Sequence, residues 1–297
     1  MRRGTYSIVA HDPQTGDLGV AVQSHWFGVG PIVPWARAGV GAVATQSIAE
    51  PAYGPRLLDR LADGASPHDA LAAELAADPQ APYRQVAVVD ARGATAVHTG
   101  ERCIAYAGDE RGEGFSAQAN MMASPDVWPA MAHAFDAASG PLARRLVAAL
   151  HAAEAHGGDV RGRQSAALLV VPAAGEPWRS SVDLRVDDDD EPLVELDRLL
   201  DLHDAYGLAT IGDELTGEGR HDEAGVAYAG ASALAPGNHE LLFWAGLAAA
   251  QAGDMPLALE RVRAAIALRP AWHELLGRLE PDVAPSAAAV LEALGEG

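Results

Sequence analysis

The chain has 297 residues, of which 49% are apolar, and its formal net charge is −20. A surface this acidic repels phosphate backbones, so we expect no nucleic-acid partner. No window approaches the roughly 18 uninterrupted apolar residues that span a bilayer, so we expect no membrane segment. The single cysteine, Cys103, excludes an intramolecular disulfide and a thiolate metal site. Together with polar residues where a signal peptide would be apolar, it predicts a cytoplasmic protein.

All 21 basic residues are arginine, which cannot act as a neutral base near pH 7, so lysine-based mechanisms are excluded. We expect no metal and no cofactor. His151 and His156 are five residues apart and diverge on a helix, which makes a poor metal pair. The spacing Gly39-x-Gly41-x-x-Ala44 fits a dinucleotide fingerprint, but it lies within strand-like sequence.

In the first 80 residues, runs rich in apolar and β-branched residues are separated by residues typical of turns. Residues 5–11 and 17–25 flank the turn Asp12-Pro13-Gln14-Thr15-Gly16, which predicts a β-hairpin. Ser66 and Pro67 are typical of an N-cap and a first helical position. The elements expected after the hairpin are strands 32–35 and 39–44 and helices 55–63 and 67–77.

The same order of elements returns in the next hundred residues. The elements expected there are strands 85–90, 94–100 and 114–123, helices 125–137 and 141–156, and strands 165–171 and 180–186. Strands, two helices, strands, two helices and strands predict an antiparallel α+β domain rather than a doubly wound parallel sheet.

The acidic run 187–191 marks a boundary between an N-terminal domain, 1–190, and a C-terminal domain, 191–297. The run lacks the spaced ligands and central glycine of a calcium loop, so we interpret it as a solvated linker. A helix over 192–203 is expected next.

A repeat follows the linker. Gly219 and Gly253, Ala224 and Ala258, and Pro236 and Pro270 pair at an offset of 34 residues. This period resembles tetratricopeptide repeats over 205–270. We expect 191–203 and 272–295 to act as helical caps, because two repeats alone are too few for stability. The alternatives are a stability or dimerisation module and a groove that binds a protein partner; a homo-oligomer is expected.

The dipeptide Gly4-Thr5 lies at the start of the first expected strand, where Thr5 is a candidate nucleophile. A threonine hydroxyl is a poor nucleophile and needs a base beside it. If the peptide bond before Thr5 is cut, the freed α-amine titrates near about pH 8 and can take the hydroxyl proton. Glycine favours such a cut because it tolerates the unusual dihedrals of a self-attacking peptide.

Four segments, GTYSIVAHDPQTGDLGVAVQSHWFGVG, PWARAGVGAVATQS, GEGFSAQANMMA and GGDVRGRQSAALLVV, resemble domain of unknown function 1028 (DUF1028) over about 5–204. This family is placed among the N-terminal-nucleophile hydrolases, with the proteasome β-subunits. The resemblance implies a four-layer αββα sandwich and amide hydrolysis by Thr5. Family members commonly begin Met-Thr, whereas residues 2–4 intervene here, so exposure of Thr5 requires cleavage at Gly4-Thr5. The lysine beside the nucleophile of proteasome-type members is also missing.

Polar residues at strand ends supply the other candidates. Amide hydrolysis needs two donors near the oxyanion, which Gln46 and the backbone around it can provide. Strand alternation sends Ser24 to one face and Gln23 and His25 to the other, and Gln23 is preferred in the place of the proteasomal aspartate. For each residue alone, structural hydrogen bonding is the alternative. The catalytic candidates are Thr5, Gln23, Gln46, Ser47 and Asn120, and the substrate-binding candidates are Ser24, His25, His98, Arg163, Gln164 and Ser165.

Two functional hypotheses remain. The first is an N-terminal-threonine amidohydrolase that cleaves a small amide or a peptide bond. The second is a non-catalytic binding or assembly protein that uses its sandwich and its repeats. The missing lysine and the residues before Thr5 favour the second, and the cluster of polar strand ends places the first slightly ahead.

Overall fold

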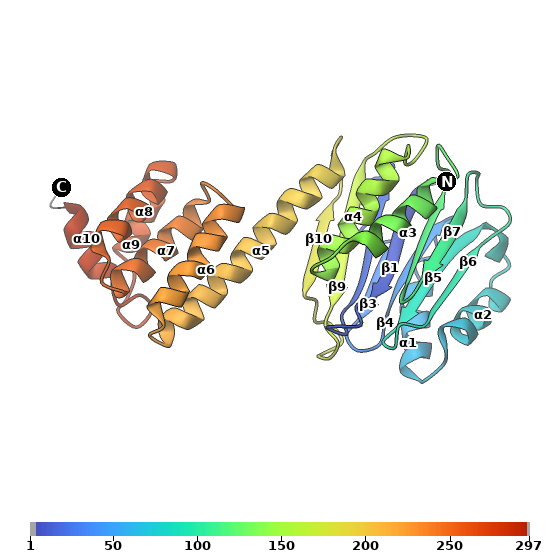
Figure 1. The fold of residues 1–297 in the computed structure, drawn as a ribbon, viewed down its shortest axis with the longest axis horizontal. Helices are drawn as coiled ribbons and strands as arrows, with labels where there is room; N and C mark the ends of the chain where they lie inside the picture. Colours follow the sequence, from blue (N-terminus) through green and yellow to red (C-terminus); the bar gives the residue numbers. More distant parts are fainter. Residues whose placement is uncertain (1–3, 296–297) are drawn as a thin grey trace. The chain divides into compact units, whose positions relative to one another are not determined.

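The computed structural model describes residues 4–295. The chain divides into two compact units, residues 1–197 and residues 198–297 (Figure 1). The division falls inside a helix, later in the chain than the acidic run at which the sequence places the boundary.

Unit 1 contains two antiparallel sheets. The six-stranded sheet has the order β10-β9-β2-β1-β8-β7, so β1 and β2 are central strands. Its strands are β1 Thr5–His11, β2 Leu18–Ser24, β7 Gly108–Gly112, β8 Phe115–Asn120, β9 Ser165–Val171 and β10 Val182–Val186. The four-stranded sheet, in the order β3-β4-β5-β6, consists of β3 Pro34–Arg37, β4 Gly41–Ser47, β5 Arg84–Asp90 and β6 Thr95–Thr99. The prediction of an antiparallel α+β domain is confirmed.

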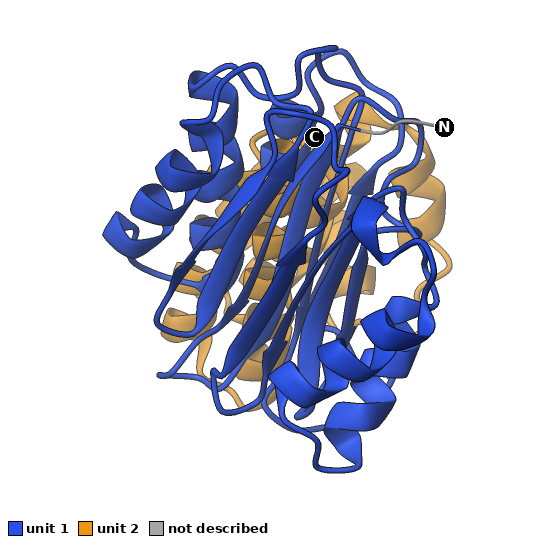
Figure 2. Cartoon of the chain, turned by 90° about the vertical axis from the view of Figure 1, so that its right-hand side faces the viewer, with its two compact units in different colours: residues 1–197 blue, residues 198–297 orange. Residues whose placement is uncertain are grey.

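Helices cover the outer face of each sheet. Helices α1 (Tyr53–Ala62) and α2 (Pro67–Ala77) pack on the four-stranded sheet, and α3 (Val127–Ala137) and α4 (Leu142–Ala155) pack on the six-stranded sheet. A short 3₁₀ helix, Ala81–Tyr83, precedes β5. The two sheets contact each other face to face, so the layers run helix, sheet, sheet, helix (Figure 2).

Alternation along the strands builds two cores. Val9 of β1, Val20 of β2 and Ala42 of β4 belong to a buried apolar cluster between the sheets. Val43 of β4, one residue from Ala42, instead joins a cluster under α1 and α2. Successive side chains of a strand point to opposite faces, so β4 supplies both of these cores.

In unit 1, one strand was not expected from the sequence and one helix begins later than expected. The strand β7 was missed because its centre is charged, with exposed Glu110 and Arg111. A charged strand is typical of a sheet edge, where it discourages pairing with another chain. Helix α3 begins at Val127 rather than at Ser124-Pro125, and its N-cap, Asp126, makes no side-chain cap hydrogen bond.

The C-terminal part of the chain is helical, as expected. Helix α5, Pro192–Gly217, runs without a break where a separate helix over 192–203 was predicted. No glycine or proline follows Pro192 before Gly207, so no breaker ends the helix at residue 203. The later helices are α6 His221–Leu234, α7 His239–Gln251, α8 Met255–Leu268, α9 Ala271–Leu276 and α10 Ala287–Gly295.

The 34-residue offset is visible in the helices themselves, because α8 begins and ends 34 residues after α6. Helices α7 and α8 share an apolar cluster with the last two helices, and Phe243 stacks on Trp272 at 4.6 Å between ring centroids. Within residues 4–295, no helix combines the length and the apolar character needed to cross a bilayer.

A histidine of α4 links this helix to the start of α5. His151 Nε2 lies 2.7 Å from Asp197 Oδ2, and this hydrogen bond raises the pKa of His151. A raised pKa contributes stability that is complete below the unfolded value of about 6.5 and is lost as pH rises through the folded pKa.

We therefore expect His151→Gln to lower the free energy of unfolding by about 0.3–1 kcal/mol near pH 5.5 and by almost nothing near pH 9, since both groups are partly exposed. Urea denaturation at the two pH values measures this. His68→Gln, in a more exposed contact with Asp69, is the matched control. An equal loss at both pH values would contradict the assignment.

Candidate functional site

One end of the space between the two sheets is polar. Seven side chains from β1, β2, β4, β5 and β8 lie there, and each residue is at most 1% exposed. We call this set the buried polar layer; its members are Thr5, Ser7, Ser24, Gln46, Gln85, Gln118 and Asn120. Buried polar groups are costly unless they are hydrogen-bonded, so the donors and acceptors of such a layer must pair with one another.

Amide side chains connect the two sheets. Ser7 Oγ donates to Gln46 Oε1 at 2.7 Å, and Gln46 Nε2 donates to Gln85 Oε1 at 2.8 Å. Asn120 Nδ2 donates to the same Gln85 oxygen at 3.0 Å, and Gln118 Nε2 donates to Ser7 Oγ at 2.6 Å. The network fixes the amide groups around the first residue of β1.

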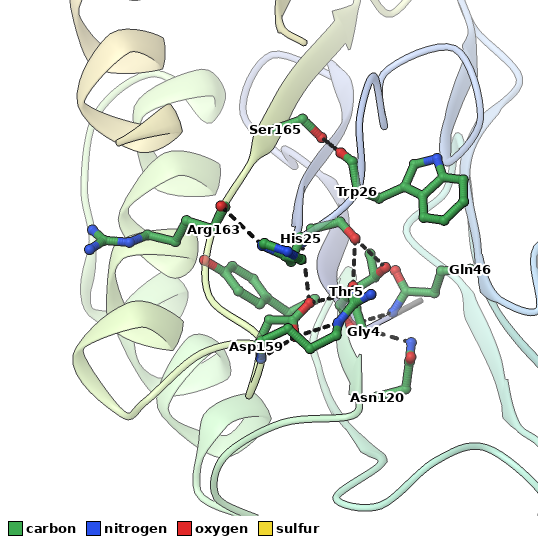
Figure 3. A network of polar contacts seen from close by, with 12 residues as sticks. Gly4, Thr5, His25, Trp26, Gln46, Asn120, Asp159, Arg163 and Ser165 are labelled. Atoms are coloured by element: carbon green, nitrogen blue, oxygen red, sulfur yellow. Dashed lines mark hydrogen bonds and ion pairs between the residues drawn. The ribbon is translucent and has the colours of Figure 1, made fainter. Parts of the chain in front are cut away.

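Thr5 lies between Ser24 of β2 and Asn120 of β8 in the strand register. Its hydroxyl oxygen is 3.0 Å from Ser24 Oγ. Its carbonyl oxygen accepts hydrogen bonds from Gln46 Nε2 and from Asn120 Nδ2, both at 3.3 Å (Figure 3). The structure thus brings four of the predicted site residues together.

The carbonyl group of Gly4, which belongs to the peptide bond preceding Thr5, has two donors. Ser24 Oγ donates to it at 2.5 Å and Arg161 Nη2 at 2.9 Å. Asp159 holds the guanidinium of Arg161 through Nη2–Oδ2 at 2.7 Å and Nε–Oδ1 at 3.1 Å. Its carboxylate also accepts the backbone N–H of His25 at 3.2 Å. A positive charge therefore lies against this carbonyl oxygen.

Glycine is required at position 4 for space. Its φ lies outside the left-handed range in the uncut chain, so the backbone conformation seen here does not itself call for glycine. A Cβ atom at Gly4 would lie 2.6 Å from Asp159 Oδ2, closer than real Cβ contacts. A side chain at this position would therefore displace Asp159, which holds Arg161.

Two residues next to the buried polar layer have left-handed backbones. Ser47 follows Gln46 with φ 71°, and Met121 follows Asn120 with φ 59°. Within residues 4–295 they are the non-glycine residues at positive φ. Such conformations cost on the order of 1–3 kcal/mol each and cluster at functional sites. Ser47, a predicted site residue, thus lies next to the buried polar layer with a strained backbone conformation.

Gln23 does not lie with Thr5. It pairs with Tyr6 in the register of β1 and β2, and that face of the sheet meets α4. Tyr6 donates its hydroxyl to Glu154 Oε1 at 2.5 Å, and burial together with Glu154 raises the pKa of Tyr6 well above its usual value. The Gln23 amide is fully buried without a hydrogen-bond partner among residues 4–295. Gln23, the residue expected in the place of the proteasomal aspartate, therefore lies on the face of the sheet opposite the Thr5 side chain.

The other predicted residues lie around the site or away from it. The His25 ring contacts the Arg163 carbonyl at 3.2 Å, whereas the Arg163 side chain pairs with Glu191. Gln164 Nε2 donates to Asp188 at 3.0 Å, in the acidic run. Ser165 Oγ donates to the Trp26 carbonyl at 2.5 Å. These side chains support loops and do not contact Thr5.

His98 lies on the far side of the four-stranded sheet. It pairs with Val86, which belongs to the core under α1 and α2, and its Nε2 is 2.9 Å from the Ala81 carbonyl. The contact with the Ala81 carbonyl fits the structural interpretation of this histidine, which pairs with Val86 and lies away from the buried polar layer.

The sequence reasoning missed five contributors, namely Ser7, Gln85, Gln118, Asp159 and Arg161. Alternation offered a signal for Ser7 and Gln118, which are two residues from Thr5 and Asn120 and so share their faces. Nothing in the segment GGDVRGRQS distinguished Arg161 from Arg163, because both lie in a loop without periodicity.

The comparisons with known proteins agree on one family. The family described as "Family of unknown function (DUF1028)" matches residues 5–196. The crystal structure of protein SPO2555 from Silicibacter pomeroyi, assigned to DUF1028, is 35% identical with a TM-score of 0.61. The similarity covers 66% of this chain and 84% of that protein. No curated protein matches the chain.

The buried polar layer leads to a stability prediction. Gln85 Nε2 donates to the carbonyl of Ala119 at 2.9 Å, and its Oε1 accepts from Gln46 and Asn120. Gln85→Leu leaves these groups buried without their partner, so we expect unit 1 to lose about 2–4 kcal/mol of unfolding free energy in urea. Gln14→Leu, at an exposed turn, is the control. A loss below about 0.5 kcal/mol would show that the layer is not stabilised by Gln85.

Proposed function

This chain belongs to the DUF1028 family, and we propose that it is an N-terminal-nucleophile amidohydrolase whose nucleophile, Thr5, is freed by cleavage of the Gly4-Thr5 bond. One observation carries the proposal: the Thr5 hydroxyl and the Gly4 carbonyl both contact Ser24 Oγ, at 3.0 and 2.5 Å. A nucleophile and the carbonyl group it would attack are thereby held at one point.

Cleavage would give Thr5 its own base. The free α-amine has a pKa near about 8 and can accept the hydroxyl proton as the oxygen attacks an amide carbonyl. An acyl-enzyme then forms at Thr5 Oγ1, and water releases the acid. Arg161, with its guanidinium beside this end of β1, provides the positive field for which proteasome-type members use a lysine.

The exposure of the Thr5 hydroxyl must differ between the uncut precursor and the proposed active form. Thr5 is 1% exposed in the intact chain, so the proposal requires its hydroxyl to become accessible once the bond before it is cut. The four layers also support the proposal, since they are the order that the resemblance to N-terminal-nucleophile hydrolases implies. We propose a small amide or a peptide as the substrate.

Intact-mass analysis of the purified chain tests the proposal. We expect wild-type protein to lose residues 1–4, and we expect Thr5→Ala to keep Gly4 and to show no amidase activity against a panel of small amides. Thr5→Ser should still be cleaved, because it retains a hydroxyl at the same place.

The fold of Thr5→Ala must be intact for this comparison, which circular dichroism and thermal melting establish. Wild-type chains that begin at Met1 or Arg2 after prolonged incubation would contradict the proposal. Full amidase activity of Thr5→Ala would refute Thr5 as the nucleophile.

A second candidate function is binding through the C-terminal repeat, residues 205–270, within a homo-oligomer or to a protein partner. It is favoured by a cavity of about 440 Å³ in unit 2, lined by Tyr228, Trp244 and Ser286 among others. This function does not need a free Thr5. An uncleaved, inactive chain would make it the better account.

A further inference from the structure

We propose that Ser24 and Arg161 perform the self-cleavage at Gly4-Thr5. Ser24 passes the Thr5 hydroxyl proton to the Gly4 carbonyl oxygen, and Arg161 stabilises the charge that develops on that oxygen. The inference rests on the proposed function, because it explains how the precursor cuts itself before any terminal amine exists.

The hydrogen-bond directions define the proton path. A serine hydroxyl has one proton, and Ser24 donates it to the Gly4 carbonyl oxygen at 2.5 Å. The 3.0 Å contact between Ser24 Oγ and Thr5 Oγ1 must then be a donation from Thr5 to Ser24. The chain of two hydrogen bonds starts on the nucleophile and ends on the oxygen of the bond to be broken.

This path solves the problem of the missing base. In the uncut chain the Thr5 nitrogen is an amide and cannot accept a proton. The chain has no lysine, and arginine stays protonated near pH 7. A relay through Ser24 needs no base, since the carbonyl oxygen itself gains the proton that Thr5 loses.

The bond changes balance without a further reagent. Thr5 Oγ1 bonds to the Gly4 carbonyl carbon while the π electrons of the C=O bond move to its oxygen, which receives the proton through Ser24. The tetrahedral carbon then re-forms its C=O bond and expels the Thr5 nitrogen, and the proton released by the oxygen ends on that nitrogen. The product is an ester at Thr5 Oγ1 with a free α-amine, and water hydrolyses it to the carboxylate of Gly4.

Arg161 is placed for the charge in this step. Its Nη2 lies 2.9 Å from the Gly4 carbonyl oxygen, and two contacts with Asp159 fix the plane of the guanidinium. The Asp159 side chain is fully buried, and the His25 backbone also donates to it. Asp159 is therefore a positioning residue. Arg161 stabilises the partial negative charge that develops on the carbonyl oxygen during the attack, and Ser24 delivers the proton that neutralises it.

The glycine before the cleaved bond is needed to keep Asp159 and Arg161 in place. Because a Cβ at Gly4 would meet the Asp159 carboxylate at 2.6 Å, a larger residue would move the group that holds Arg161. The structure thus gives the self-cleavage site a requirement for glycine that comes from the positioning of Arg161.

The experiment follows full-length chains, made by pulsed cell-free translation, by intact mass over time. We expect Ser24→Ala to slow the loss of residues 1–4 by about 100-fold or more, and Arg161→Gln by about 10- to 100-fold. Arg161→Lys should recover part of the rate because it restores the positive charge.

Matched controls separate chemistry from folding. Ser116→Ala removes another fully buried serine of the same sheet, and Arg37→Gln removes an arginine of similar exposure, paired with Asp59. Both should be cleaved within about twofold of wild type. Ser24→Cys keeps the branching of the side chain, with a somewhat larger atom, and should still be slow because a thiol is a weak donor. It decides the matter if Ser24→Ala does not fold.

Hydroxylamine provides the second readout, since it attacks the ester and accelerates release of residues 1–4 from wild type. In Ser24→Ala it should have little effect, because the ester forms slowly. Cleavage of both Ser24 variants or of Arg161→Gln at the rate of the controls would overturn the relay while leaving the proposed function in place. A wild-type chain that is never cleaved would instead contradict the proposed function itself.

Discussion

The pairing of β1 on both sides is the constraint on which the site depends. Thr5 is opposite Ser24 on β2 and opposite Asn120 on β8, and a shift of β1 by one residue would send the Thr5 side chain to the other face of the sheet, away from both. Thr5 pairs with a strand on each side, and the Gly4 carbonyl before it accepts hydrogen bonds from Ser24 and Arg161. The proposed chemistry therefore lies at the first residue of a central strand.

The buried polar layer shows what this placement of Thr5 requires. Amides between two sheets are stabilising only when their donors and acceptors are matched, and Gln46 and Gln85 meet this condition through bonds to both sheets. The left-handed backbones of Ser47 and Met121 add strain at the same end. A scaffold without chemistry would be more stable with apolar residues there, so the layer is better explained by the placement of Thr5 than by stability.

Much of the fold could be predicted from the sequence, because alternation and turn residues are local signals. The hairpin of β1 and β2 and the two pairs of helices follow from such patterns. The face on which Gln23 and Ser24 lie could not be predicted, because alternation shows that they point in opposite directions but not which of them lies beside Thr5. Arg161 was missed for a related reason: its role comes from Asp159 and Gly4, a contact across 157 positions of the chain that no local pattern encodes.

The central claim is that Thr5 becomes the terminal residue with a free amine beside a free hydroxyl. Periodate oxidises this amino-alcohol to an aldehyde and leaves threonine within a chain untouched. An aminooxy reagent then labels the aldehyde, so labelling detects a terminal Thr5. The account predicts that the purified protein takes up one label, located at residue 5 by peptide mapping. A protein that takes up no label and retains Gly4 in its terminal peptide would contradict it.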